Sequence, residues 1–174
     1  MSIDIGRPAR DETNDYYHQY IDLVPDGDIR QILVDQRDEV LDFHESIPSK
    51  LAGHRYAEGK WSIAELLGHI NDAERLYTMR AFWFARGMTT AMPSYEGDEA
   101  MIASRAGERH LDTHIHEFGS IRAATIDLFR FLPDDAWMRT GVASGLPFTV
   151  RAFAYIAAGH VLHHVGILKA RYLV

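Results

Sequence analysis

Four long segments of this chain carry apolar residues at the three- and four-residue spacing of an α-helix, and almost nothing alternates like a β-strand. Proline and glycine residues cluster between these segments, where they favour turns. The chain has 174 residues, of which 47% are hydrophobic, so it can form the core of one compact domain. The pattern predicts an all-α protein built from four helices.

The first two expected helices have clear end signals. The first spans residues 28–47 and ends at Pro48, because the residue before a proline disfavours helical backbone. The second begins at Ser62, which forms a capping box with Glu65, and it continues to Arg86 before a glycine.

The second half of the chain contains two further helices and a long connection. We expect a loop or lid over residues 87–98 and a short separate helix over residues 99–108. The third long helix spans residues 112–132 with Asp112 as its N-cap. The fourth starts after the cap residue Thr149 and runs nearly to the C-terminus.

Residues 1–27 are predicted to form an arm that precedes the helical bundle of residues 28–174. This arm is polar but contains three tyrosines that can dock on the bundle, so its placement stays open. It has no apolar region typical of a signal peptide, and the chain has no run of about 18 apolar residues that would span a bilayer. We therefore expect a soluble, cytoplasmic protein with no membrane partner.

The chain contains no cysteine and has a formal net charge of −7. The first property excludes disulfides, cysteine-ligated zinc and a thiol nucleophile of its own. The second opposes the counterion release that drives binding to nucleic acid. We expect no nucleic-acid partner.

Three of the ten histidines have the spacing of a metal site. His160 and His164 are four residues apart on the fourth helix, so both imidazoles lie on one face. His69 lies on the inward face of the second helix, where an unpaired imidazole is costly. Together they can bind a divalent ion and leave coordination positions open.

A structural explanation competes with this hypothesis, because core histidines often bond to a carbonyl or a carboxylate. His163 is an alternative ligand to His164, since a three-residue spacing also brings side chains together. His110 and His114 have the same spacing as the favoured pair but straddle a helix boundary. His44 and His114 are fallback ligands, and we expect His18, His44, His54 and His116 to lie at the surface or the rim.

Two carboxylates flank His69, namely Glu65 four residues before it and Asp72 three residues after it. Either can orient the imidazole or act as a base. Alternatively, they belong to the solvated face of the helix, where ion pairs are weak.

An ordered set of motifs resembles the DinB-like, or DinB/YfiT-like, superfamily over residues 28–174. The motifs are W-S-x-x-E-L-x-x-H-I-x-D-A-E-R-x-Y from Trp61, L-P-D-D-A-W from Leu132, and A-G-H-x-x-H-H-x-G-x-L from Ala158. The resemblance implies an up-and-down four-helix bundle with a long inserted connection. It also implies a homodimer and a metal held by His69, His160 and His164.

Some members of this family are S-transferases or isomerases that use low-molecular-weight thiols, so the resemblance favours a metal-dependent transferase with a bacillithiol- or mycothiol-type thiol. Such a metal lowers the pKa of the thiol. We expect Arg80, Trp83, Tyr95 or Arg122 to bind the second, small substrate.

Two other functions stay open. One is metal-dependent hydrolysis with Glu65 or Asp72 as the base. The other is a non-catalytic helical protein that binds a metal or ligand. Three imidazoles suit zinc or nickel, and also iron or copper.

Overall fold

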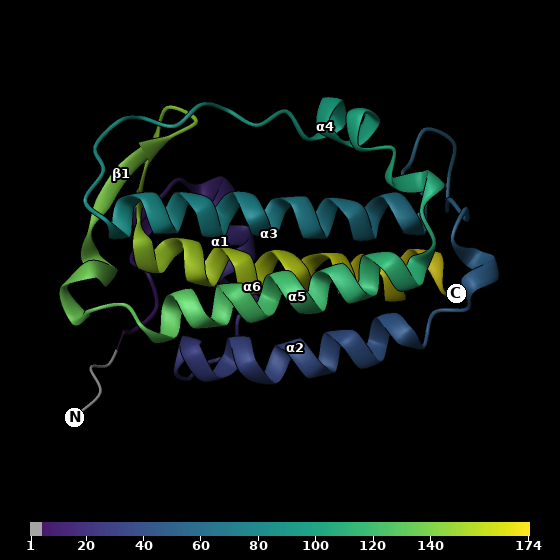
Figure 1. The fold of residues 1–174 in the computed structure, drawn as a ribbon, viewed down its shortest axis with the longest axis horizontal. Helices are drawn as coiled ribbons and strands as arrows, with labels where there is room; N and C mark the ends of the chain where they lie inside the picture. Colours follow the sequence, from purple (N-terminus) through teal and green to yellow (C-terminus); the bar gives the residue numbers. More distant parts are fainter. Residues whose placement is uncertain (1–4) are drawn as a thin grey trace.

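A computed structural model describes residues 5–174, in which four long helices form a bundle (Figure 1). Helices α3 and α2 each contact both α5 and α6, so the four helices surround a common core. The bounds are α2 Ile29–Glu45, α3 Ile63–Ala85, α5 Leu111–Arg130 and α6 Val150–Ile167. The fold therefore contains the four expected helices.

Helix α5 runs parallel to α3. The side-chain amide of Asn71, early in α3, donates to the carbonyl of His114, early in α5, at 3.0 Å. Further along both helices, the hydroxyls of Thr78 and Thr125 are 3.0 Å apart. The chain after α3 returns to the end where α3 began before α5 starts (Figure 1). The helix directions are thus up, down, down, up, and the alternating up-and-down order expected from the resemblance is wrong at α5.

Side-chain caps set the start of three of these helices, and the sequence predicted two of them, Ser62 and Thr149. Asp28 accepts from the Arg30 amide, and Thr149 accepts from the Ala152 amide at 3.1 Å. At α3, Ser62 and Glu65 form the capping box that the sequence predicts. These local signals need no tertiary contact, which explains why they were visible in the sequence.

The start of α5 differs from the prediction. His110 occupies the N-cap position without a side-chain hydrogen bond, and Asp112 lies inside the first turn. Leu111 is buried at the first helical position, with 3% of its surface exposed. Burial of this leucine extends the helix beyond the capping residue expected from its chemistry, so the assignment of Asp112 as N-cap is wrong.

A β-hairpin precedes α6 and corrects the all-α expectation. Strand β1 (Thr140–Ala143) pairs antiparallel with β2 (Leu146–Thr149). The turn between them uses Ser144 and Gly145, which both have positive φ, at 53° and 75°. The strands were missed because they have only four residues each and contain a glycine and a proline.

The connection between α3 and α5 is tethered to this hairpin. The Met92 amide donates to the Val142 carbonyl at 2.9 Å, and the Ser144 amide donates to the Met92 carbonyl at 3.0 Å. The expected short helix is split into α4 (Gly97–Ser104) and a 3-10 turn, η3 (Ala106–Glu108). The break occurs at Arg105, whose backbone is left-handed with φ of 53°.

The N-terminal arm contributes helix α1 (Asp15–Ile21), which lies against α6. Residues 1–4 of the arm are outside the described residues. Tyr20 and Ile21 are buried, and a Cβ added at Gly159 of α6 would lie 2.0 Å from the Tyr20 carbonyl oxygen. The two backbones therefore meet without an intervening side chain.

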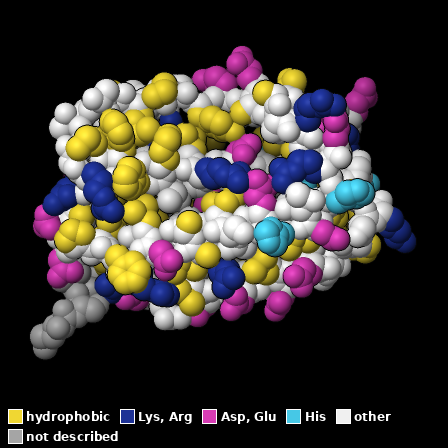
Figure 2. Space-filling view, viewed as in Figure 1, with side chains coloured by type: hydrophobic (Ala, Val, Ile, Leu, Met, Phe, Trp, Pro, Cys, Tyr) yellow, Lys and Arg dark blue, Asp and Glu magenta, His cyan; other side chains and the backbone are white. Residues whose placement is uncertain are grey.

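The surface shown in Figure 2 carries side chains of both charges. Figure 2 shows basic and acidic side chains interspersed on one face, with hydrophobic side chains gathered over the C-terminal half of α3 and the connection. Met79, Phe82 and Met88 are exposed there. Among the helices described, none combines the length and apolar character required to cross a membrane.

Candidate metal centre

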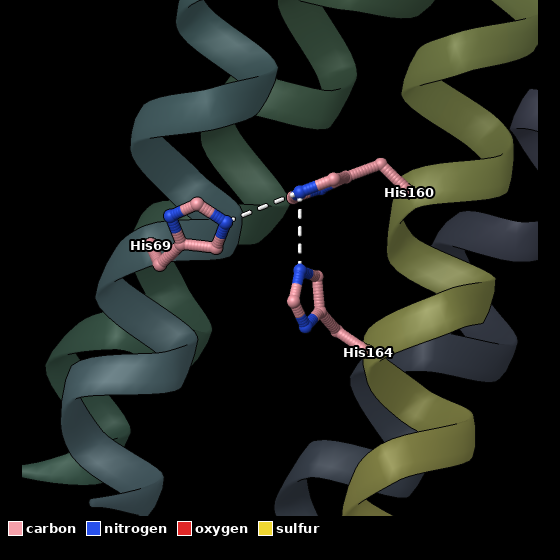
Figure 3. Close-up of side chains that lie close together, drawn as sticks. All are labelled: His69, His160 and His164. Carbon is pink, nitrogen blue, oxygen red and sulfur yellow. Dashed lines mark hydrogen bonds between the residues drawn. The ribbon is translucent and has the colours of Figure 1, made fainter. Parts of the chain in front are cut away.

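Three imidazoles converge between α3 and α6 (Figure 3). The Nε2 atom of His160 lies 3.2 Å from Nε2 of His69 and 3.1 Å from Nε2 of His164. One ligand nitrogen from each ring lies within 4.8 Å of the others. The structure thus brings together the three histidines that the sequence singled out.

The helices explain this convergence. His160 and His164 are one turn apart on α6 and face α3, which runs antiparallel to α6. Aromatic rings surround them, because Tyr20 and Tyr77 lie 5.3 and 5.5 Å from His160, centroid to centroid. The Trp61 ring lies 4.7 Å from that of His69. This apolar enclosure removes water from the imidazoles.

Burial keeps the three imidazoles neutral. It lowers the pKa of His69 to about 4, with the charge of Asp98 opposing the shift. It lowers the pKa of His164 to about 3, and the other histidines add to the effect. The pKa of His160 lies well below its ordinary value for the same two reasons. All three therefore offer lone pairs at neutral pH, which is the form that binds a metal.

The donor set fits a divalent ion better than a hydrogen-bonded cluster. An imidazole nitrogen has either one proton or one lone pair in the ring plane, so Nε2 of His160 makes one good hydrogen bond while it faces two nitrogens. A tetrahedral ion with bonds of about 2.0–2.1 Å places its ligand nitrogens about 3.3 Å apart. The two spacings from Nε2 of His160, 3.1 and 3.2 Å, are close to this value.

The other ring nitrogens agree with this interpretation. Nδ1 of His69 and of His164 are buried and have no hydrogen-bond partner in the described structure. A neutral imidazole that coordinates through Nε2 has its proton on Nδ1. The two rings thus lack the outer-shell acceptor that commonly orients a ligating histidine, and packing against aromatic rings orients them instead.

Two cavities reach the histidine group. The first, of about 170 Å³, contains His69 and His160 among its lining residues. The second, of about 320 Å³, is lined on its other sides by Tyr56, Lys60, Trp61 and Asp98, and reaches His164. A larger cavity, of about 730 Å³, lies between α2 and α5 and touches none of the three histidines. Proximity to the ligands makes the two smaller cavities the candidate substrate sites.

The four expected substrate-binding residues have different positions. Arg80 and Tyr95 line the first cavity. Trp83 does not, and its Nε1 donates to the Thr90 carbonyl at 3.2 Å. Arg122 is buried between α2, α3 and α5, where it pairs with Glu74. The structure therefore brings two of the four to the histidines.

Neither expected carboxylate lines the two cavities beside the histidines. Glu65 forms an ion pair with Arg55 at 2.6 Å and caps α3. Asp72 faces another cavity, where burial raises its pKa and Arg75 opposes the shift. Asp98 lines the second cavity, and sequence analysis missed it because no motif marks a carboxylate at the start of a short helix in a long connection.

The remaining histidines lie outside the metal group. His163 is half-buried, with its ring 5.3 Å from that of Tyr20. The ring of His114 bonds to the Ala106 carbonyl at 3.0 Å. His18 and His44 are buried, with 2% and 1% of their surfaces exposed, so their expected surface positions are wrong. The His44 ring packs against that of Phe118 of α5 at 5.7 Å, whereas His54 and His116 are exposed as expected.

A sequence model of the DinB superfamily matches residues 32–168. The chain belongs to the DinB superfamily. No curated protein matches it. The family assignment agrees with the order of motifs in the sequence and with the convergence of the three histidines.

Two solved structures share the fold of this DinB-superfamily chain. One is YfiT from Bacillus subtilis, described as a probable metal-dependent hydrolase with an unusual four-helix bundle topology. It matches with a TM-score of 0.70 and 14% sequence identity, and the match covers 94% of this chain and 90% of YfiT. The mycothiol-dependent maleylpyruvate isomerase matches with a TM-score of 0.65 and 17% identity. That match covers 79% of this chain and 58% of the isomerase.

Proposed function

We propose that this DinB-superfamily protein is a metal-dependent transferase that joins a low-molecular-weight thiol to a small electrophilic substrate. The observation that carries the proposal is the convergence of three neutral imidazoles, which are reached by two cavities. Neutral ligands do not reduce the charge of a divalent ion. When bound, the ion would act as a Lewis acid and lower the pKa of a thiol.

The two cavities give room for two reactants on either side of the histidines. We assign the electrophile to the first cavity, beside Arg80 and Tyr95, and the thiol to the second, beside Trp61 and Lys60. The sulfur forms a bond to an electrophilic carbon, the leaving group departs with its electron pair, and the thiol proton passes to solvent. The chain has no cysteine, so the thiol must come from outside.

The positions of Glu65 and Asp72 favour thiol transfer over hydrolysis with either of these two carboxylates as the base. A metal-assisted hydrolase commonly needs a base close to the attacking water. Glu65 is occupied by Arg55, and Asp72 faces a different cavity. The two structural neighbours, a probable metal-dependent hydrolase and a mycothiol-dependent isomerase, support metal chemistry and thiol chemistry respectively.

Further properties belong to the same proposal. We propose zinc or nickel as the ion, with iron or copper as alternatives that the same ligands suit. We also propose that the protein is cytoplasmic and forms a homodimer.

A cobalt-substituted protein tests the thiol proposal. Bacillithiol- or mycothiol-like thiols should produce a sulfur-to-cobalt charge-transfer band, and a variant with all three histidines replaced by alanine should show none. Cobalt that binds to the wild type but responds to no such thiol would rule out thiol transfer and leave the metal site intact.

Hydrolysis is the second candidate, and Asp98 favours it because this carboxylate shares the second cavity with His164. If the protein is a hydrolase, it should cleave activated esters or amides, and both His160→Ala and Asp98→Asn should abolish turnover. Turnover that survives in Asp98→Asn would exclude this residue as the base.

A further inference from the structure

Arg80 is a buried cation with no carboxylate partner among the described residues. Only 1% of its surface is exposed. Its Nη2 donates to the Pro93 carbonyl at 2.8 Å and to the Ser144 hydroxyl at 3.0 Å. Its buried Nε has no hydrogen-bond partner. A buried charge without a counter-ion is costly, so this position needs an explanation.

Arg122 shows how the same chain holds a buried arginine for structural reasons. It is 0% exposed, and it forms two bonds with the Glu74 carboxylate, at 2.5 and 2.7 Å. Its remaining Nη1 donates to Gln36. Every face of that guanidinium is thus occupied by the protein, whereas Arg80 has its charge unpaired at the wall of the first cavity.

The other walls of the first cavity suit an anion. Five tyrosines and a serine contribute to the lining, and among the described lining residues no carboxylate is present and Arg80 is the one arginine or lysine. Burial raises the pKa of Tyr17, and the nearby positive charge of Arg80 opposes that shift. The Tyr17 hydroxyl is therefore a protonated donor at neutral pH.

A single cationic side chain, that of Arg80, favours a carboxylate over a phosphate as the ligand. One guanidinium matches the single charge and the planar shape of a carboxylate, whereas a phosphate dianion is usually met by several cations or by a helix N-terminus. The cavity of about 170 Å³ is smaller than typical sites for drug-sized ligands. Both features favour an acid with few carbons.

We infer that the first cavity binds the carboxylate of a small carboxylic acid through Arg80, with the reacting end of that acid directed to His69 and His160. This inference extends the proposed function, because it assigns the chemical class of the electrophilic substrate. A purely structural role for Arg80, as a tether of the connection to the hairpin, needs Nη2 alone. Such a structural role leaves the unpaired positive charge of Arg80 unexplained.

The test uses metal-free protein in the presence of a chelator, so that failure of the metal proposal does not affect it. Crotonate is the probe, crotonamide is its uncharged counterpart, and inorganic phosphate is the competing anion. We expect crotonate to shift the ¹⁵N–¹H resonance of the Arg80 Nε and to raise the melting temperature. Crotonamide and phosphate should have much smaller effects.

Two arginine variants make the test specific. Arg80→Gln should weaken crotonate binding by about tenfold or more, the usual size of a lost charged hydrogen bond. Arg86→Gln, one residue beyond α3 and exposed, should bind crotonate like the wild type.

Three results would overturn the inference: no response of the wild-type Arg80 resonance, an equal response to crotonamide or phosphate, or unchanged binding in folded Arg80→Gln. If Arg80→Gln does not fold, the response of the wild-type Arg80 Nε resonance to crotonate decides whether the inference holds. A positive result beside a failed metal-binding experiment would sustain the anion site and reject the proposed enzyme.

Discussion

At the scale of single residues, His160 has the central position in the metal centre, because its Nε2 faces both other histidines. We predict that His160→Ala loses the bound ion, since two imidazoles seldom hold a divalent ion tightly. Elemental analysis of protein without a histidine tag should give about one ion per chain for the wild type and almost none for the variant.

His163 provides the matched control for this experiment. It is adjacent to His164 in sequence but lies outside the converging group. His163→Ala should therefore retain the ion. Loss of the metal in this variant with retention in His160→Ala would contradict the assignment of ligands.

His44 provides a prediction of pH dependence. Burial lowers the pKa of His44 to about 4, from an ordinary value of 6.5, and neither ring nitrogen has a partner in the described structure. The unfolded chain therefore binds more protons than the folded chain below pH 6.5. Stability falls as the pH drops from 6.5 towards 4, by about 1.4 kcal/mol per pH unit from this residue.

His44→Leu should remove this contribution, because leucine does not titrate. Urea unfolding at pH 6.5, 5.5 and 4.5, with a chelator present for both proteins, measures the difference in slope. Parallel pH dependences of the wild type and the variant would show that His44 does not titrate as its burial implies.

At the scale of elements, the contact between α1 and α6 depends on a residue without a side chain. A Cβ at Gly159 would lie 2.0 Å from the Tyr20 carbonyl oxygen, and backbone cannot move aside as a side chain can. We predict that Gly159→Ala lowers the free energy of unfolding by about 1–3 kcal/mol, as overpacking usually does. Faster proteolysis within residues 5–22 should accompany the loss.

Gly166, on the same helix, is the control for this substitution. A Cβ at that position meets nothing within 4 Å. Gly166→Ala should stabilise the protein by about 0.5–1 kcal/mol, because alanine favours a helix more than glycine does. Equal effects of the two substitutions in urea unfolding would mean that α1 does not press on α6.

At the scale of the whole molecule, the metal centre joins α3 to α6, which are far apart in sequence. An ion present at 100 times its dissociation constant would add about 2.7 kcal/mol to the stability of the folded state. For a domain of this size, each kcal/mol corresponds to about 2–4 °C in melting temperature. We therefore predict that chelation lowers the melting temperature by roughly 5–10 °C.

The variant with His69, His160 and His164 all replaced by alanine is the control for chelation. Its melting temperature should be the same with and without chelator. An equal drop in this variant would show that the chelator acts elsewhere on the protein.

Features that depend on near neighbours in the chain could be predicted from the sequence. Caps such as Ser62 with Glu65 involve residues three apart, and the helical period places His160 and His164 on one face. Those local rules predicted four helices, and with the inward face of the second helix they singled out the three histidines that converge in the structure.

Which residues meet across helices could not be predicted from the sequence and follows from the packing of the bundle. The helical period shows that Arg80 and Arg122 belong to helices, but not that Glu74 neutralises one and that the other faces a cavity. Neither the parallel course of α5 nor the burial of His44 has a local signal. Helical periodicity fixes a side chain relative to its own axis, whereas its partners depend on how the connections place the other helices around it.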